Sequence, residues 1–95
     1  MKWIELIRVR STAEALEAAM PSLSHLINEI EEAADEAETL FMQHAMYDGD
    51  LAVVVVWRNA MKPHKTREGL LLTQRLQMLG SVDHAVWIPA ITGNS

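Results

Sequence analysis

The spacing of hydrophobic residues along the chain alternates between the two-residue period of strands and the three-to-four-residue period of helices. Residues 2–10 (KWIELIRVR) alternate imperfectly and are rich in β-branched and aromatic side chains, which predicts a strand. Ser11 stands three residues before Glu14, the spacing of a capping box, and predicts the start of a helix. Beyond it, apolar side chains at steps of three and four form one helical stripe: Leu16, Met20, Leu23, Ile27, Ile30, Ala34 and Ala37. Pro21 falls inside this stripe and lacks a backbone donor, so we expect a kink or a short break there.

The next segment predicts a β-hairpin. Residues 39–47 (TLFMQHAMY) and residues 51–58 (LAVVVVWR) flank the triplet DGD at residues 48–50. Asp-Gly suits a two-residue type I′ turn between two strands. With the first two residues of the triplet as the turn, His44 lies opposite Val53, and the pairing of the other residues follows.

Both faces of this predicted hairpin are largely apolar. One face carries Leu40, Met42, His44, Met46, Leu51, Val53, Val55 and Trp57. The other carries Phe41, Gln43, Ala45, Tyr47, Ala52, Val54, Val56 and Arg58. A small antiparallel sheet with helices on one side normally has a polar face toward water, and a large exposed apolar patch is unusual for a monomer. We therefore expect a second copy of the chain to cover the face that the helices leave open.

A second helix and a fourth strand complete the pattern. After a polar loop, Thr66 predicts the N-cap of a helix over residues 67–79, and Gly80 is suited to the position after its end. Gly69 allows this helix to lie close to the sheet. Residues 83–89 (DHAVWIP) predict the last strand.

The predicted order of elements is β-α-β-β-α-β, a ferredoxin-like α+β fold with a four-stranded antiparallel sheet. A length of 95 residues suits one domain, which we assign to residues 1–90, with residues 91–95 as a C-terminal tail. A chain this short buries only a modest core. Association into a homodimer extends that core.

Composition excludes several classes of function. The net charge of −5 argues against non-specific nucleic-acid binding, which needs a basic surface. The chain has no cysteine, so disulfides, thiolate metal sites and cysteine nucleophiles are excluded. The longest uncharged apolar run, residues 51–57, is far too short to cross a membrane, and we expect a cytoplasmic protein with no membrane partner. The four histidines share no local metal-ligand spacing, so we expect neither a metal nor a cofactor.

Six side chains on the predicted strands are candidates for lining a ligand cavity. They are Arg8, Gln43, His44, Tyr47, Trp57 and Arg58. The polar members suit a small acidic or aromatic ligand, or alternatively they lie near the sheet ends and form salt bridges between subunits. His44 is either a base tuned by burial or a hydrogen-bonded core residue. Trp57 either stacks on a planar ligand or packs in the core, and no catalytic residue is assigned.

Basic side chains gather just before and at the start of the second predicted helix: Lys62, His64, Lys65 and Arg67. Backbone donors and the helix dipole bind anions at such a position. Because no glycine-rich loop accompanies them, the alternative is a charged loop that is simply solvated.

Two segments resemble a known superfamily. The sequence VVVVWRN at residues 53–59 and the sequence LQMLGSVDHAVWI at residues 76–88, with the order of elements, are similar to the dimeric α/β-barrel superfamily. The similarity is to its antibiotic-biosynthesis-monooxygenase-like, uncharacterised branch. It implies two ferredoxin-like sheets that pack face to face across a dimer. Members include cofactor-free oxygenases, haem-degrading enzymes and proteins without known activity, so the fold alone says little about function.

The haem-degrading members use an Asn on the first strand and a Trp and a His on the helix after the third strand. Here the first strand has no Asn, and the predicted helix over residues 67–79 has neither Trp nor His. The resemblance therefore does not extend to that chemistry. Two hypotheses remain: a barrel that binds a small organic molecule, with or without monooxygenase-like activity, and a non-catalytic structural or regulatory module that recruits a partner protein.

Overall fold

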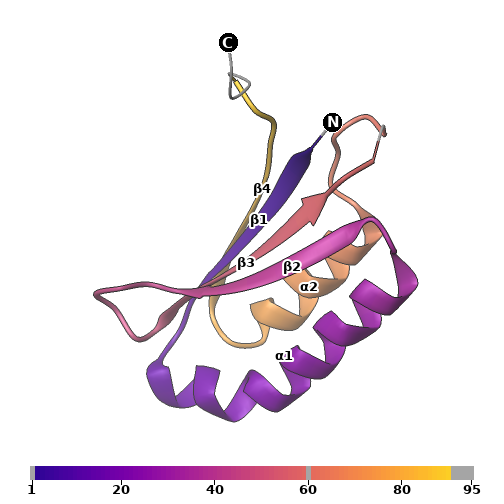
Figure 1. Ribbon diagram of the computed structural model, residues 1–95. Coiled ribbons are helices and arrows are strands. Elements are labelled where there is room, and N and C mark those ends of the chain that lie inside the picture. The colour runs from indigo at the N-terminus through magenta and orange to yellow at the C-terminus, as the bar shows by residue number, and fades with distance from the viewer. Residues whose placement is uncertain (1, 60, 91–95) are drawn as a thin grey trace.

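The computed structural model describes residues 2–59 and 61–90. Its elements are β1 (Trp3–Arg10), α1 (Ala13–Ala33), β2 (Ala37–Gln43), β3 (Asp50–Trp57), α2 (Arg67–Gln77) and β4 (Ser81–Trp87). In this part of the chain the four strands form one antiparallel sheet in the order β2-β3-β1-β4. Both helices lie on the same face of the sheet (Figure 1). The predicted ferredoxin-like α+β fold is confirmed.

Strand alternation gives the sheet a helix side and an open side. In β1, Trp3, Glu5, Ile7 and Val9 are buried toward the helices, while the residues between them are half-buried or exposed. The pairing registers place alternate residues of β3 and β4 on the same two sides. Because β3 and β1 are the two central strands, they carry most of the buried strand residues.

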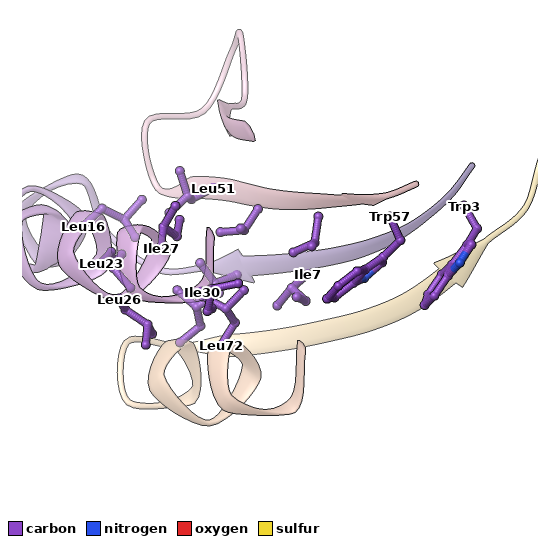
Figure 2. Close-up of a cluster of buried hydrophobic side chains, with 14 residues drawn as sticks. Trp3, Ile7, Leu16, Leu23, Leu26, Ile27, Ile30, Leu51, Trp57 and Leu72 are labelled. Carbon is purple, nitrogen blue, oxygen red and sulfur yellow. The ribbon is translucent and has the colours of Figure 1, made fainter. Parts of the chain in front are cut away.

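The helix side is filled by a hydrophobic core (Figure 2). The helices contribute Leu16, Leu23, Leu26, Ile27 and Ile30 from α1, and Leu72 and Leu76 from α2. Burial of each such side chain stabilises the fold by roughly 1.5–3 kcal/mol. Figure 2 shows Trp3 and Trp57 at one end of this cluster, away from the Leu16 end of α1. The two indoles therefore close the core at one end of the sheet.

Helix α1 differs from the prediction at its start and in its middle. Its N-cap is Thr12, whose hydroxyl accepts a hydrogen bond from Ala15 N at 3.1 Å. The predicted N-cap, Ser11, instead donates its hydroxyl to the Leu79 carbonyl at 2.6 Å. The helix also continues through Pro21 without a break. The apolar stripes before and after Pro21 pack on the same core, and this packing outweighs the local cost of the proline.

The β2–β3 hairpin has a different register from the predicted one. β2 ends at Gln43, which pairs with Leu51, where the predicted turn would have placed Met46. Asp48 and Gly49 are the middle residues of a turn, as predicted, which Asp50 N closes by donating to the Tyr47 carbonyl at 3.2 Å. The strands do not extend to this turn, because residues 44–49 form a longer loop, and Gly49 lacks the positive φ that a type I′ turn requires. The predicted register is therefore wrong by three positions. Because this number is odd, every β2 side chain faces the opposite side of the sheet from the predicted one.

Two glycines allow other parts of the chain to approach the end of β1 closely. A Cβ at Gly49 would lie 2.3 Å from the Ser11 carbonyl oxygen, and Ser11 N donates to the Gly49 carbonyl at 2.7 Å. A Cβ at Gly80 would lie 2.1 Å from the Arg10 carbonyl oxygen. Gly80 was predicted to follow directly after the second helix, but α2 ends at Gln77 with Met78 as its C-cap, and Gly80 has no positive φ. Both glycines hold the end of β1, a contact that local sequence patterns do not reveal.

The open side of the sheet presents an apolar surface, which we call the open face. Its central row crosses all four strands and consists of Leu40, Val54, Leu6 and Ala85. The neighbouring rows add Ile4, Met42, Ala52, Val56 and Trp87. Leu40, Met42 and Trp87 are about half exposed, and both helices lie on the other side of the sheet (Figure 1). An apolar second side was predicted and is present, although the β2 residues on it differ from the predicted ones.

The remaining predictions concern the ends of the chain and its environment. Thr66 is confirmed as the N-cap of α2, since its hydroxyl accepts from Gly69 N at 3.0 Å. Among the described residues, no helix is both long and apolar enough to cross a membrane. The predicted tail over residues 91–95 lies outside the described residues.

Candidate functional site

A carboxylate lies inside the hydrophobic core. Glu5 occupies an inward position of β1 between Trp3 and Ile7, and its side chain is wholly buried. Burial of a carboxylate without partners is unfavourable by several kcal/mol. The fold must therefore bring hydrogen-bond donors to this point.

Four donors converge on the two oxygens of Glu5. Oε1 accepts from Trp57 Nε1 at 2.9 Å and from the Thr66 hydroxyl. Oε2 accepts from Thr66 N at 3.1 Å and from His84 Nε2 at 2.6 Å. The Thr66 hydroxyl itself accepts from Gly69 N, so its own hydrogen is free to point at Glu5. Trp57 Nε1 and Thr66 N can only donate, so each oxygen of Glu5 accepts at least one hydrogen bond.

His84 balances the charge of Glu5. The side chains of His84 and Glu5 are 5% and 0% exposed, and they form an ion pair when the imidazole is protonated. Opposite a carboxylate, Nε2 is the ring nitrogen that donates, because a carboxylate oxygen can only accept. Removing one partner of a buried pair costs about 3–5 kcal/mol. We refer to these two residues as the buried pair.

Helix α2 reaches the buried pair because of Gly69. A Cβ at this position would lie 1.9 Å from Glu5 Oε2 and 2.7 Å from Glu5 Cδ. The missing side chain brings the first turn of α2 against Glu5, where the helix dipole favours a negative charge. The prediction that Gly69 lets the helix lie close to the sheet is confirmed.

A pocket of about 250 Å³ adjoins the buried pair, and we call it the tryptophan pocket. Its lining residues are Trp3, Trp57, Asn59, Met61, His64, Thr66, Arg67 and Glu68. Trp3 and Trp57 stack with ring centroids 5.7 Å apart and planes 23° apart (Figure 2). Trp3 Nε1 donates to Asn59 Oδ1 at 3.1 Å. Rigid aromatic walls with a few polar groups suit a small organic ligand.

His64 brings a proton acceptor to this pocket. Its Nδ1 lies 2.7 Å from the Lys62 carbonyl oxygen. A carbonyl can only accept, so Nδ1 donates, and the neutral ring then presents Nε2 as an acceptor. The ring lies 5.7 Å from that of Trp3, between centroids, and the residue is exposed to solvent, with which it can exchange protons. His64 is therefore the candidate general base of the pocket.

A larger hollow of about 760 Å³ separates α1 from α2. Its walls are mainly aliphatic and include Leu26, Ile30, Leu70 and Leu71. None of the described residues that line it is a histidine or an aromatic residue. Nor do any three histidine or acidic side chains of the described residues lie close enough to hold a metal ion. The tryptophan pocket is thus the stronger candidate for chemistry.

The six predicted site residues do not gather in one place. Arg8 is exposed on the open side of the sheet. Arg58 is exposed and pairs with Glu38 at the end of the hairpin strands. Gln43 is exposed on the helix side, at the end of β2. Of the six, Trp57 is the one that lines the tryptophan pocket.

His44 and Tyr47 lie together, but in the loop over residues 44–49. His44 Nδ1 accepts from the backbone N–H groups of Met46 and Tyr47 at 2.9 and 3.2 Å. The two rings are 4.8 Å apart between centroids, and both residues are exposed. The prediction of a histidine in mid-strand among apolar neighbours is therefore wrong, because the strand ends before it.

Sequence reasoning missed the buried pair. A signal for Glu5 is present, since it is a charged residue at the same strand parity as Trp3, Ile7 and Val9. His84 offers no comparable signal, because it is 79 positions away and only the β1–β4 register brings it to Glu5. His64 was noticed only as part of a basic loop.

Comparisons with known proteins identify the fold. No family model matches the chain, and no curated protein matches it. Rv0793 from Mycobacterium tuberculosis is 18% identical with a TM-score of 0.68, over 99% of this chain and 100% of that one. A protein from Nitrosomonas europaea assigned as an antibiotic biosynthesis monooxygenase is 7% identical with a TM-score of 0.68, over 96% and 92%. A variant of SnoaB, a cofactor-independent oxygenase from Streptomyces nogalater, is 12% identical with a TM-score of 0.61, over 99% and 98%. The chain shares its ferredoxin-like fold with these three proteins.

Proposed function

We propose that the protein is a homodimeric α/β barrel that binds a small planar organic molecule in the tryptophan pocket and acts on it as a cofactor-free, monooxygenase-like enzyme. The observation that carries the proposal is the combination of two fixed indole walls with a histidine of defined tautomer. SnoaB, which has the same fold, is a cofactor-independent oxygenase, and this supports the reaction class.

The proposed chemistry begins with the removal of a proton from the bound molecule. A phenol that loses its proton becomes an electron-rich anion, and a ring carbon of this anion can bond to dioxygen. The O–O bond then breaks, so that one oxygen atom stays on the ring as a quinone carbonyl and the other leaves as water with the ring hydrogen and the phenol proton. Dioxygen is the only oxidant that this step needs. His64 Nε2 accepts the proton. Arg67 lines the same pocket, and its positive charge favours the anion that forms. The expected substrate is therefore a small phenol.

Binding and chemistry are tested separately with 1-naphthol as the probe. Tryptophan fluorescence follows binding, and an oxygen electrode follows consumption of dioxygen. We expect His64→Gln to bind 1-naphthol but to lose oxygen uptake, because the amide is not a base. His25→Gln on the exposed face of α1 is the matched control and keeps both. Binding without oxygen uptake by the wild-type protein would leave a non-catalytic ligand-binding module, and absence of binding would contradict the proposal as a whole.

The homodimer is proposed from the open face. Its central row is apolar across all four strands, while the rows toward one end add Arg8, Asp83, Arg10 and Asp50. An apolar centre with a polar rim is typical of a protein interface. At about 25 cal/mol per Å² of apolar area, covering this surface stabilises the assembly. A second copy with the same face is the occupant that the superfamily resemblance implies.

The dimer is tested by native mass spectrometry and light scattering of wild-type protein and two matched variants. Leu40 on the open face and Leu70 on α2 are 46% and 48% exposed. We expect Leu40→Lys to shift the population to monomers, because it places a charge in the covered centre. Leu70→Lys leaves the dimer intact. Equal effects of the two substitutions, or a monomeric wild-type protein, would contradict the proposed interface.

A further inference from the structure

We propose that the buried pair, Glu5 and His84, is a positioning pair that holds one wall of the tryptophan pocket rigid and so makes the pocket select planar ligands over thicker ones. Neither side chain lines the pocket. Both act through Trp57 and Thr66, which do line it. The proposed selectivity rests on the proposed ligand-binding function, whereas the proposal that Glu5 and His84 fix the orientation of Trp57 does not.

The first attachment is the indole of Trp57. Its N–H donates to Glu5 Oε1 at 2.9 Å, and its face stacks on Trp3. Trp3 is held in turn by its own bond to Asn59. Each ring of the stacked pair thus has one fixed partner for its N–H. Without Glu5, the buried N–H of Trp57 would lack its acceptor, and the ring would be free to tilt.

The second attachment is the start of α2. Thr66 gives both its hydroxyl and its backbone N–H to Glu5, which ties the first turn of the helix to β1. The same turn contributes Arg67 and Glu68 to the pocket lining. Glu5 therefore fixes the separation between the indole wall and the helix, and this separation sets the thickness of ligand that fits.

His84 supplies the donor and counter-charge that keep Glu5 in place. It comes from β4, on the opposite side of β1 from β3 and Trp57. Its substitution removes no atom from the pocket lining. The hydrogen bond to Glu5 links His84 to Trp57 and Thr66, the two lining residues that Glu5 holds. This makes His84 the sharpest position for a test.

The hold on Trp57 is tested by NMR of the indole N–H resonances, with Trp57→Phe used for assignment. His84→Leu removes the donor to Glu5, whereas His84→Gln keeps a neutral N–H donor. We expect the Trp57 resonance to move upfield in the Leu variant and to return toward its wild-type position in the Gln variant. His25→Leu, an exposed control on α1, leaves it unchanged. An unchanged Trp57 resonance in His84→Leu overturns the inference.

The selectivity is tested with 1-naphthol and its saturated counterpart, 1-decalol. The wild-type protein is expected to prefer the planar molecule, and His84→Leu is expected to lower that preference about tenfold, the effect of losing one well-oriented aromatic contact. His84→Gln restores most of the preference. Equal weakening for both probes, or an unchanged preference, overturns the inference. A wild-type protein that binds neither probe refutes the proposed function instead, while the Trp57 resonance still tests the pair.

If the Leu variant does not fold, His84→Asn, whose amide is too short to reach Glu5, replaces it in both measurements.

Discussion

Replacement of Gly69 by alanine is expected to destabilise the protein, although this substitution within a helix normally does the opposite. Alanine is favoured over glycine in a helix interior by about 1 kcal/mol, and Gly69 has no positive φ that would require glycine. The opposing effect comes from Glu5, whose Oε2 would lie 1.9 Å from the new Cβ. An exposed carboxylate would move aside at little cost. Glu5 is wholly buried and held by four donors, so it cannot.

The magnitude follows from the bonds that Oε2 would lose. If Oε2 moves, it separates from Thr66 N and from His84 Nε2. Hydrogen bonds to a charged group contribute about 1.5–3 kcal/mol each, so the loss of two costs about 3–6 kcal/mol. After the gain in helix propensity, the free energy of unfolding falls by about 2–5 kcal/mol. For a chain of this size, the melting temperature falls by at least about 8 °C.

Urea and thermal unfolding at equal protein concentration measure the effect, since association would otherwise change the apparent stability. Gln74→Ala, at an exposed position of the same helix, is the control and is expected to be close to neutral. The double variant Glu5→Ala/Gly69→Ala should lose less stability than the sum of the single variants, because the clash is absent. A Gly69→Ala protein as stable as the wild type would refute the packing argument.

Three further substitutions test local features by the same unfolding measurements. Thr12→Ala removes the N-cap of α1 and should lower stability by about 1 kcal/mol, with Ser24→Ala in the middle of the helix as control; equal effects would contradict the cap assignment. Pro21→Ala restores a backbone donor inside α1 and should raise stability by about 1–2 kcal/mol, and a loss of stability would show that the helix needs the proline. Arg58→Ala breaks an exposed ion pair with Glu38 and should change stability by less than about 1 kcal/mol, so a larger loss would contradict its assignment as a surface contact.

The fold is predictable from the sequence because its main determinants are local. Apolar periods locate both helices and all four strands, and the order of elements limits the topology. The register of the β2–β3 hairpin, by contrast, cannot be predicted from neighbouring residues alone. Asp48 and Gly49 do form a turn, but the paired strands do not extend to it, and Gly49 also lies against the Ser11 carbonyl, far away in the sequence. The same holds for Ser11, whose hydroxyl caps the Leu79 carbonyl, far along the chain, instead of the adjacent helix. Gly49 and Ser11 thus have the composition of local signals, while both also contact distant backbone that those signals do not reveal.

Strand alternation predicts one part of the candidate site, the burial of Glu5, but not the residues that bind it. The parity of β1 places Glu5 on the same side as Trp3, Ile7 and Val9, so its burial follows from the sequence once that side is known to face the helices. Burial of a carboxylate then requires several donors. Their number follows from the chemistry of two oxygens, but their identities depend on two strand registers and on the approach of α2. In the sequence, Gly69 is the residue that indicates this close approach of α2 to Glu5. In this chain, a charged residue on an otherwise apolar strand face and a glycine in the first turn of the helix that packs on it together indicate a buried polar centre, although its other partners cannot be named from the sequence.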